Sequence, residues 1–280
     1  MRLAEYQSKA IEDLAGIYPE PEARSIISLL IQERLGLPSY APVTEPDREI
    51  PTDQLDEDLK RLLDNEPIQY ILGYAEFYGR RFRVTPDVLI PRPETEELVE
   101  AVLRCQVAQE HDPSILDLCT GSGCIAWTLA LEIPDATVVG VDISPEALNV
   151  ARNQFHDPRV SFRRADVLKR FPVAAGNDYD IIVSNPPYVL ESERAEMRRN
   201  VLDYEPALAL FVPDEDPLKF YRALAAHAKA LLVKNGFGIF EANSRFCGEI
   251  AELLKPDFTD VRILKDISGR DRFVSFRNAE

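Results

Sequence analysis

The chain has 280 residues, of which 45% are hydrophobic and 29% are charged, and its formal net charge is −16 at pH 7. This length suffices for one large domain and a small one, and the composition is typical of a soluble globular protein. The charge argues against nucleic acid as a direct partner, because that binding draws on grouped lysine and arginine side chains. A basic protein partner suits an acidic surface better.

The sequence also argues against a membrane protein. No run of eighteen or more apolar residues is present, and the first residues lack a secretory apolar region. The four cysteines show neither Cys-x-x-Cys spacing nor a nearby histidine, so no metal is expected. Scattered thiols of this kind predict a reduced, cytoplasmic protein in which they are mostly buried: Cys105, Cys119, Cys124 and Cys247.

Residues 1–74 are predicted to form a small helical domain. Apolar residues recur at helical spacing over 3–18, 21–35 and 53–63. Prolines precede the second of these helices, and Gly36 and Pro38 follow it, as start and stop signals do. Residues 38–51 form a proline-rich linker.

Residues 75–90 are predicted to form a hairpin linker with Gly79 near its turn, and residues 91–280 a second domain. Strands and helices alternate there, which predicts a parallel sheet with helices on both faces. We expect strands at 114–118, 136–141, 160–164, 179–184 and 236–241, helices at 94–106, 122–132, 144–154, 217–232 and 246–255, and a final antiparallel pair at 259–264 and 271–276.

A glycine turn follows the first strand of this sheet. Gly121 and Gly123 permit a tight turn and close approach of the backbone to a ligand. The next strand ends in Asp142, where a carboxylate can accept both hydroxyls of an adenosine ribose. The third glycine of a dinucleotide site is replaced by Ala126, and no phosphate-binding lysine follows. We therefore expect an adenosine ligand without a pyrophosphate, namely S-adenosylmethionine.

The most informative segment is Asn185-Pro-Pro-Tyr188, which ends the apolar run 179–184. The two prolines donate no backbone hydrogen bond, so their carbonyls and the Asn185 side chain can face a ligand as fixed polar groups. Tyr188 offers a flat ring for stacking. A planar group that carries an NH2 fits this arrangement. The alternative is a plain Pro-Pro turn that ends a strand.

The order of these motifs resembles class I methyltransferases that act on planar nitrogens, among them DNA adenine-N6 and protein glutamine-N5 enzymes. The segment from Pro67 to Glu96 narrows the resemblance to the HemK/PrmC family, and Tyr204-Glu-Pro206 and Gly269-Arg-Asp-Arg272 agree with it. One departure is Val167, which stands where relatives often carry a large aromatic residue.

This resemblance implies an α/β fold: a class I S-adenosylmethionine-dependent methyltransferase sheet, Rossmann-like, with a small N-terminal helical bundle that docks the substrate. It implies methyl transfer to N5 of the glutamine in the Gly-Gly-Gln motif of class I peptide-chain release factors, with S-adenosylhomocysteine as the product. The expected catalytic residues are Asn185, Pro186 and Tyr188. Substrate binding is expected from these three with Pro187, Arg92 and Thr95, and cofactor binding from Cys119, Thr120, Gly121, Ser122, Gly123, Asp142, Asp166, Val167 and Asn185.

Two other activities stay open at this point, namely a ribosomal-protein glutamine methyltransferase and a nucleic-acid adenine-N6 methyltransferase. A scaffold that binds S-adenosylmethionine without catalysis is a third alternative, against which the intact Asn185-Pro-Pro-Tyr188 argues. Glu94 and Glu96 open a helix, where an acidic residue already favours the dipole. Glu241 ends an apolar strand without an evident role.

Overall fold

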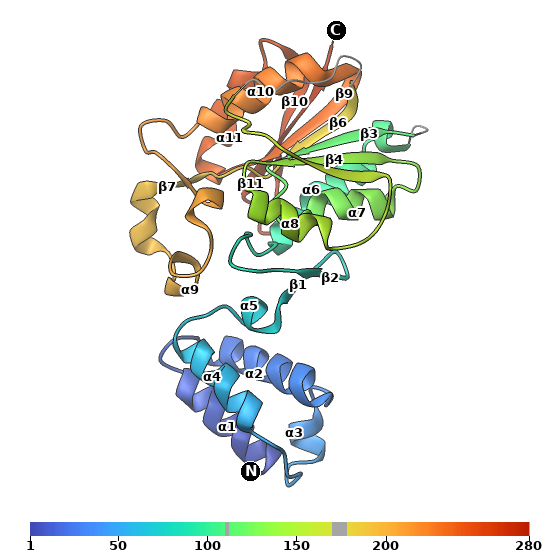
Figure 1. The fold of residues 1–280 in the computed structure, drawn as a ribbon. Coiled ribbons are helices and arrows are strands. Elements are labelled where there is room, and N and C mark those ends of the chain that lie inside the picture. Colours follow the sequence, from blue (N-terminus) through green and yellow to red (C-terminus); the bar gives the residue numbers. More distant parts are fainter. Residues whose placement is uncertain (110–111, 170–177, 280) are drawn as a thin grey trace. The chain divides into compact units, whose positions relative to one another are not determined.

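The structure, a computed structural model, describes residues 1–109, 112–169 and 178–279. It separates into two compact units (Figure 1): Met1–Tyr74 with Met197–Tyr204, and Ala75–Glu196 with Glu205–Glu280. The short segment Met197–Tyr204 differs from the predicted division, which placed it within 91–280. Two contacts tie it to the helical residues: Arg198 pairs with Glu22 at 2.7 Å, and the Tyr204 hydroxyl donates to the carbonyl of Asp64 at 3.0 Å.

The first unit is helical and has its own apolar core, to which α1, α2, α4 and α5 contribute. The first helix ends at Leu14, not at Tyr18 as predicted, because Gly16 and then Pro19 disfavour its continuation. Within the predicted linker 38–51 lies one short helix. The helices are α1 (Leu3–Leu14), α2 (Glu20–Leu35), α3 (Ala41–Thr44), α4 (Asp53–Leu63), α5 (Ile68–Leu72) and α9 (Arg199–Leu202).

A β-hairpin opens the second unit and consists of β1 (Tyr74–Phe77) and β2 (Arg80–Arg83). Its turn residues, Tyr78 and Gly79, have φ values of 49° and 70°, as a type I′ turn requires. The side chain of Gln154 pairs with both backbone groups of Arg83 at 2.8 Å, and it also donates to the carbonyl of Ser122 at 3.0 Å. The hairpin is thereby attached to the glycine turn.

The main sheet has seven strands in the order β10-β11-β9-β6-β3-β4-β5. The central strands pair in parallel, and β11 runs antiparallel to both of its neighbours, so the predicted sheet and its final antiparallel pair are confirmed. The strands are β3 (Ser114–Leu118), β4 (Thr137–Asp142), β5 (Val160–Arg164), β6 (Tyr179–Ser184), β9 (Leu232–Glu241), β10 (Phe258–Lys265) and β11 (Asp271–Asn278), with a separate pair β7 (Val189–Leu190) and β8 (Phe211–Val212).

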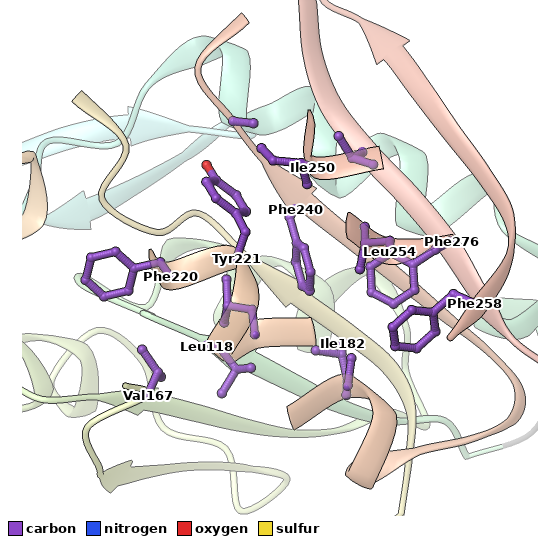
Figure 2. Close-up of a cluster of buried hydrophobic side chains, with 14 of the residues drawn as sticks. Leu118, Val167, Ile182, Phe220, Tyr221, Phe240, Ile250, Leu254, Phe258 and Phe276 are labelled. Carbon is purple, nitrogen blue, oxygen red and sulfur yellow. The ribbon is translucent and has the colours of Figure 1, made fainter. Parts of the chain in front are cut away.

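Helices cover both faces of the sheet (Figure 1). Alternate residues of the apolar strands point to opposite faces, so Ile181 and Val183 pack under α6 and α7, whereas Ile182 packs in the core beneath α10 and α11 that Figure 2 shows. The helices of this unit are α6 (Pro93–Arg104), α7 (Cys124–Glu132), α8 (Pro145–Arg152), α10 (Lys219–Leu231) and α11 (Cys247–Leu254). In the described parts of the chain, no helix is both long enough and apolar enough to cross a membrane.

Gly238 lies where β9 faces the ring of Phe276 on β11, and a Cβ atom added there would lie 2.1 Å from that ring. Phe276 is fully buried against Phe240 and Phe258, so its ring has little room to move. We predict that Gly238→Ala lowers the free energy of unfolding by about 1–3 kcal/mol through overpacking, measured by urea denaturation.

Gly248→Ala provides the matched control, because no atom beyond its chain neighbours and the backbone of its own helix, α11, lies within 4 Å of the added methyl. It should leave the free energy of unfolding unchanged or raise it by up to about 1 kcal/mol. Equal effects of the two substitutions would contradict the packing argument.

Candidate functional site

The register of the parallel strands places their carboxyl-terminal ends side by side. Leu118 pairs with Val141 on one side and with Ser184 on the other, and Ser184 pairs in turn with Phe240. The residues that follow these positions therefore emerge at one edge of the sheet, where ligands bind in open α/β folds. A cavity opens at this edge, and all of its lining residues belong to the second unit.

The glycine turn forms one wall of the cavity. Cys119, Gly121 and Gly123 all have positive φ values, of 63°, 54° and 78°, so the backbone turns sharply after β3. A Cβ atom at Gly123 would lie 3.0 Å from Ala151 and 3.1 Å from Phe162 and Trp127. Gly121 lines the cavity and Gly123 does not, so the second glycine serves helix packing.

Asp142, the last residue of β4, holds the glycine turn and the next loop together. Its Oδ2 accepts from the backbone N–H of Gly121 at 2.9 Å, and its Oδ1 accepts from that of Ser144 at 3.0 Å. Burial raises the pKa of Asp142, while these backbone hydrogen bonds lower it. A carboxylate has about four acceptor positions, so both oxygens can still accept hydroxyl groups from a ligand.

The loop after β5 supplies an apolar wall. Asp166 is held by the backbone N–H of Leu168 at 3.0 Å, and Nε2 of His227 donates to the carbonyl of Val167 at 2.8 Å. Leu168 of this loop lines the cavity, and so does Ile143, which follows β4. Of their surfaces, 44% and 39% are exposed. Exposed apolar side chains beside a carboxylate with spare acceptor positions fit an adenosine, as S-adenosylmethionine requires.

Asn185 begins the turn after β6 and lines the cavity together with Pro187. Its Nδ2 donates to the Thr95 hydroxyl at 3.1 Å, and that hydroxyl donates to Oε2 of Glu241 at 2.8 Å. The Tyr188 hydroxyl donates to Oε1 of Glu241 at 3.1 Å. Burial raises the pKa values of Tyr188 and Glu241, so the phenol stays protonated.

Arg92 lines the cavity and pairs with Glu205, whose side chain is 1% exposed, at 2.6 Å. The other oxygen of Glu205 accepts from the backbone N–H of Ile90 at 3.1 Å. Two of the guanidinium nitrogens take no part in this pair, so Arg92 retains donors for a ligand. The Arg92–Glu205 pair fixes the segment before α6 against the segment after Tyr204.

Most of the predicted residues lie at this cavity, but their roles stay predictions. Arg92 and Thr95 line it, and so do all of the predicted cofactor residues except Gly123. Pro186 and Tyr188 are not among the lining residues. The sequence did not identify Glu205 as a functional residue and found no role for Glu241; the only signals were the Tyr-Glu-Pro segment and an acid that ends an apolar strand.

The cysteines and acids of the site give no sign of thiol or metal chemistry. Burial raises the pKa of Cys124 to about 12 and raises that of Cys119 further, so both thiols are protonated at neutral pH. Among 1–109, 112–169 and 178–279, no group of three His, Cys, Asp or Glu side chains could hold a metal ion. That the reaction needs no metal remains a prediction.

Comparison with known proteins covers both units. Residues 5–73 match the family model of the PrmC N-terminal domain, and residues 115–204 match that of a methyltransferase domain. A release factor glutamine methyltransferase of Bacteroides thetaiotaomicron is 45% identical over 280 residues, and one of Flavobacterium psychrophilum is 39% identical over 282 residues; each match covers 98% of both chains. A methyltransferase structure from Pyrococcus furiosus, 16% identical, covers 80% of this chain and 100% of its own, with a TM-score of 0.50, which shows the fold alone.

The buried carboxyl of Asp117 should make the free energy of unfolding depend on pH. This carboxyl is fully buried in β3, where Oδ2 accepts from the Thr120 hydroxyl at 2.5 Å and Oδ1 has no partner. Burial raises its pKa from 3.8 to about 7. The folded protein therefore holds a proton that the unfolded chain releases, so this group's contribution to stability is complete below pH 4 and is lost as the pH rises to about 7.

We predict that the free energy of unfolding of ligand-free Asp117→Asn falls less steeply between pH 4 and 7 than that of the unsubstituted protein, because asparagine is uncharged throughout. Urea denaturation at a series of pH values measures both slopes. All other titrating groups are shared, so identical slopes would show that Asp117 does not titrate in this range.

Proposed function

This chain belongs to the release factor glutamine methyltransferase family, and we propose that it methylates N5 of the glutamine in the Gly-Gly-Gln motif of class I peptide-chain release factors. One observation carries the proposal: Asn185, at the start of an Asn-Pro-Pro-Tyr turn, opens onto the same cavity as the glycine turn and Asp142.

The cofactor of this family is S-adenosylmethionine, which supplies a methyl group activated by its sulfonium when bound. We propose that Asp142 accepts the ribose hydroxyls and that Asp166 and Val167 hold the adenosine. Ile143 and Leu168 would lie against the adenine, since both are exposed apolar residues of the cavity wall. Thr120 to Ser122 present the glycine turn to the remainder of the molecule.

The proposed chemistry concerns an amide nitrogen, which is a poor nucleophile because its lone pair is delocalised into the carbonyl. Oδ1 of Asn185 and the carbonyl of Pro186 can accept its two hydrogens and so favour rehybridisation at nitrogen. Hydrogen bonds that strengthen as positive charge develops there stabilise the transition state. The ring of Tyr188 is proposed to orient the amide plane, since its hydroxyl is already bound to Glu241.

The helical unit is proposed to dock the release factor. Residues 1–74 contain seven lysines and arginines and fifteen acidic residues, a formal charge of −8, which is half of the total. This unit has a core of its own and all cavity-lining residues belong to the other unit, so it is available for a separate contact. A basic surface on the partner would complement it. None of the four cysteines takes part in a disulfide, which supports a cytoplasmic location.

We predict that Asp142→Ala weakens binding of S-adenosylmethionine by about 10- to 100-fold, since losing a charged hydrogen-bond acceptor costs about 1.5–3 kcal/mol. Calorimetric titration measures the dissociation constant. Asp135→Ala, an exposed acid just before the opposite end of β4, makes the same chemical change as a control and should bind normally. Unchanged affinity of Asp142→Ala would remove this residue from the site.

We predict that the protein, incubated with S-adenosylmethionine and a purified release factor, adds 14 Da to the peptide that contains the Gly-Gly-Gln glutamine (about the mass of one methylene group). Mass spectrometry locates the change. Asn185→Ala should reduce turnover by about 100-fold, as loss of one transition-state contact does. Transfer to DNA adenine and none to protein would overturn the proposal.

A further inference from the structure

A closed path of hydrogen bonds joins the two ends of the Asn185–Tyr188 turn. Asn185 Nδ2 donates to Thr95 Oγ1 at 3.1 Å, and the Thr95 hydroxyl donates to Glu241 Oε2 at 2.8 Å. The Tyr188 hydroxyl donates to the other oxygen, Glu241 Oε1, at 3.1 Å. Thr95 and Glu241 are 2% and 1% exposed. Water therefore has little access to replace these contacts, and breaking one leaves a buried polar group unsatisfied.

The chemistry of the three groups sets the direction of the path. Both hydroxyls donate to the oxygens of Glu241, as an ionised carboxylate, which only accepts hydrogen bonds, requires. A threonine hydroxyl has a single proton, and that of Thr95 is used on Glu241. Its oxygen can then only accept from Asn185, which requires the NH2 end of the carboxamide to face Thr95. Oδ1 of Asn185 is left as the end that is free for a ligand.

We propose that Thr95 and Glu241 are positioning residues that hold the Asn185 carboxamide with Oδ1, rather than Nδ2, available to the substrate amide. This inference rests on the proposed function, in which Asn185 accepts a hydrogen from the glutamine NH2. A carboxamide rotated by 180° would place one NH2 group against another. Neither oxygen of Glu241 needs to touch the substrate.

The partners of the Glu241 carboxyl act against the effect of its burial, although its pKa is raised overall. Burial raises its pKa and Glu94 adds to that effect, but the hydrogen bonds from Thr95 and Tyr188 and the charge of Arg272 act against it. Arg272 is itself held by Asp266 at 3.3 Å. The Tyr221 hydroxyl donates to the backbone carbonyl of Glu241 at 2.9 Å, which fixes the end of β9.

The test compares three substitutions in the full-length protein, with a Gly-Gly-Gln peptide as the methyl acceptor. Thr95→Val keeps the shape of the side chain and removes the hydroxyl. We expect kcat to fall by about 10- to 100-fold, as it does when a hydrogen-bond partner that orients a metal ligand is lost, while the dissociation constant of S-adenosylmethionine changes less than about twofold. Thr95→Ser restores the hydroxyl and should recover most of the rate.

Thr128→Val is the matched control, because the Thr128 hydroxyl is buried in α7 without a hydrogen-bond partner. It makes the same chemical change outside the path and should leave kcat unchanged. Glu241→Gln is a second variant, since either orientation of its carboxamide opposes one of the two hydroxyl donors. It should lower kcat within the same range.

A double substitution separates positioning from general structural support. If Thr95 acts through Asn185, then Thr95→Val should cause no further loss of kcat in an Asn185→Ala background, because the effects of coupled residues are not additive. A further 10-fold loss there, or near-normal kcat in Thr95→Val alone, would reject this inference while the proposed function stands. No methyl transfer to glutamine by the unsubstituted protein would reject both.

Discussion

In-register parallel pairing of β3 with β4 and β6 is the constraint on which the site depends. These strands are covered on both faces, so their backbone groups can be satisfied only by neighbouring strands. With Leu118 opposite Val141 and Ser184, the next residues along each strand are Cys119, Asp142 and Asn185. A slip of one residue would turn every side chain of a strand to the other face. The apolar cores thus fix the polar edge of the sheet.

Two buried carboxyls at this edge are accommodated in different ways. Asp117 has one hydroxyl donor and an unpartnered oxygen, and its pKa rises to about 7, so it can be neutral near physiological pH. Glu241 receives two hydroxyl donors and lies near Arg272, and these favour its charged form against the effect of burial. Burial and hydrogen bonding act in opposite directions on a carboxyl group. Only the second arrangement gives each carboxyl oxygen a hydroxyl donor.

Local patterns predicted the parts of the fold that depend on neighbours in sequence. The apolar runs gave the strands, Gly79 located the hairpin turn, and Gly121 with Asp142 located one wall of the cavity. These features follow from backbone conformation and burial, which act over a few residues. The hydroxyl of Tyr188, in contrast, was assigned no partner, because nothing near it in sequence offers an acceptor.

The unpredicted features are pairs that only the tertiary structure brings together. Thr95 and Glu241 are separated by 146 positions, and Arg92 and Glu205 by 113. When a charged residue ends an apolar strand, the neighbouring sequence does not indicate which residue will pair with it. The same holds for Met197–Tyr204, whose membership of the helical unit depends on contacts with Glu22 and Asp64.

The Asn-Pro-Pro-Tyr turn cannot fix its own geometry. Its two prolines donate no backbone hydrogen bonds, and the side chains of Asn185 and Tyr188 attach the turn to other elements. Both side chains are tied, directly or through Thr95, to the single carboxylate of Glu241. Helix α6 and strand β9 supply these anchors from distant parts of the chain. The motif supplies the groups that can contact a planar amide. Thr95 and Glu241 determine which end of the Asn185 carboxamide makes that contact.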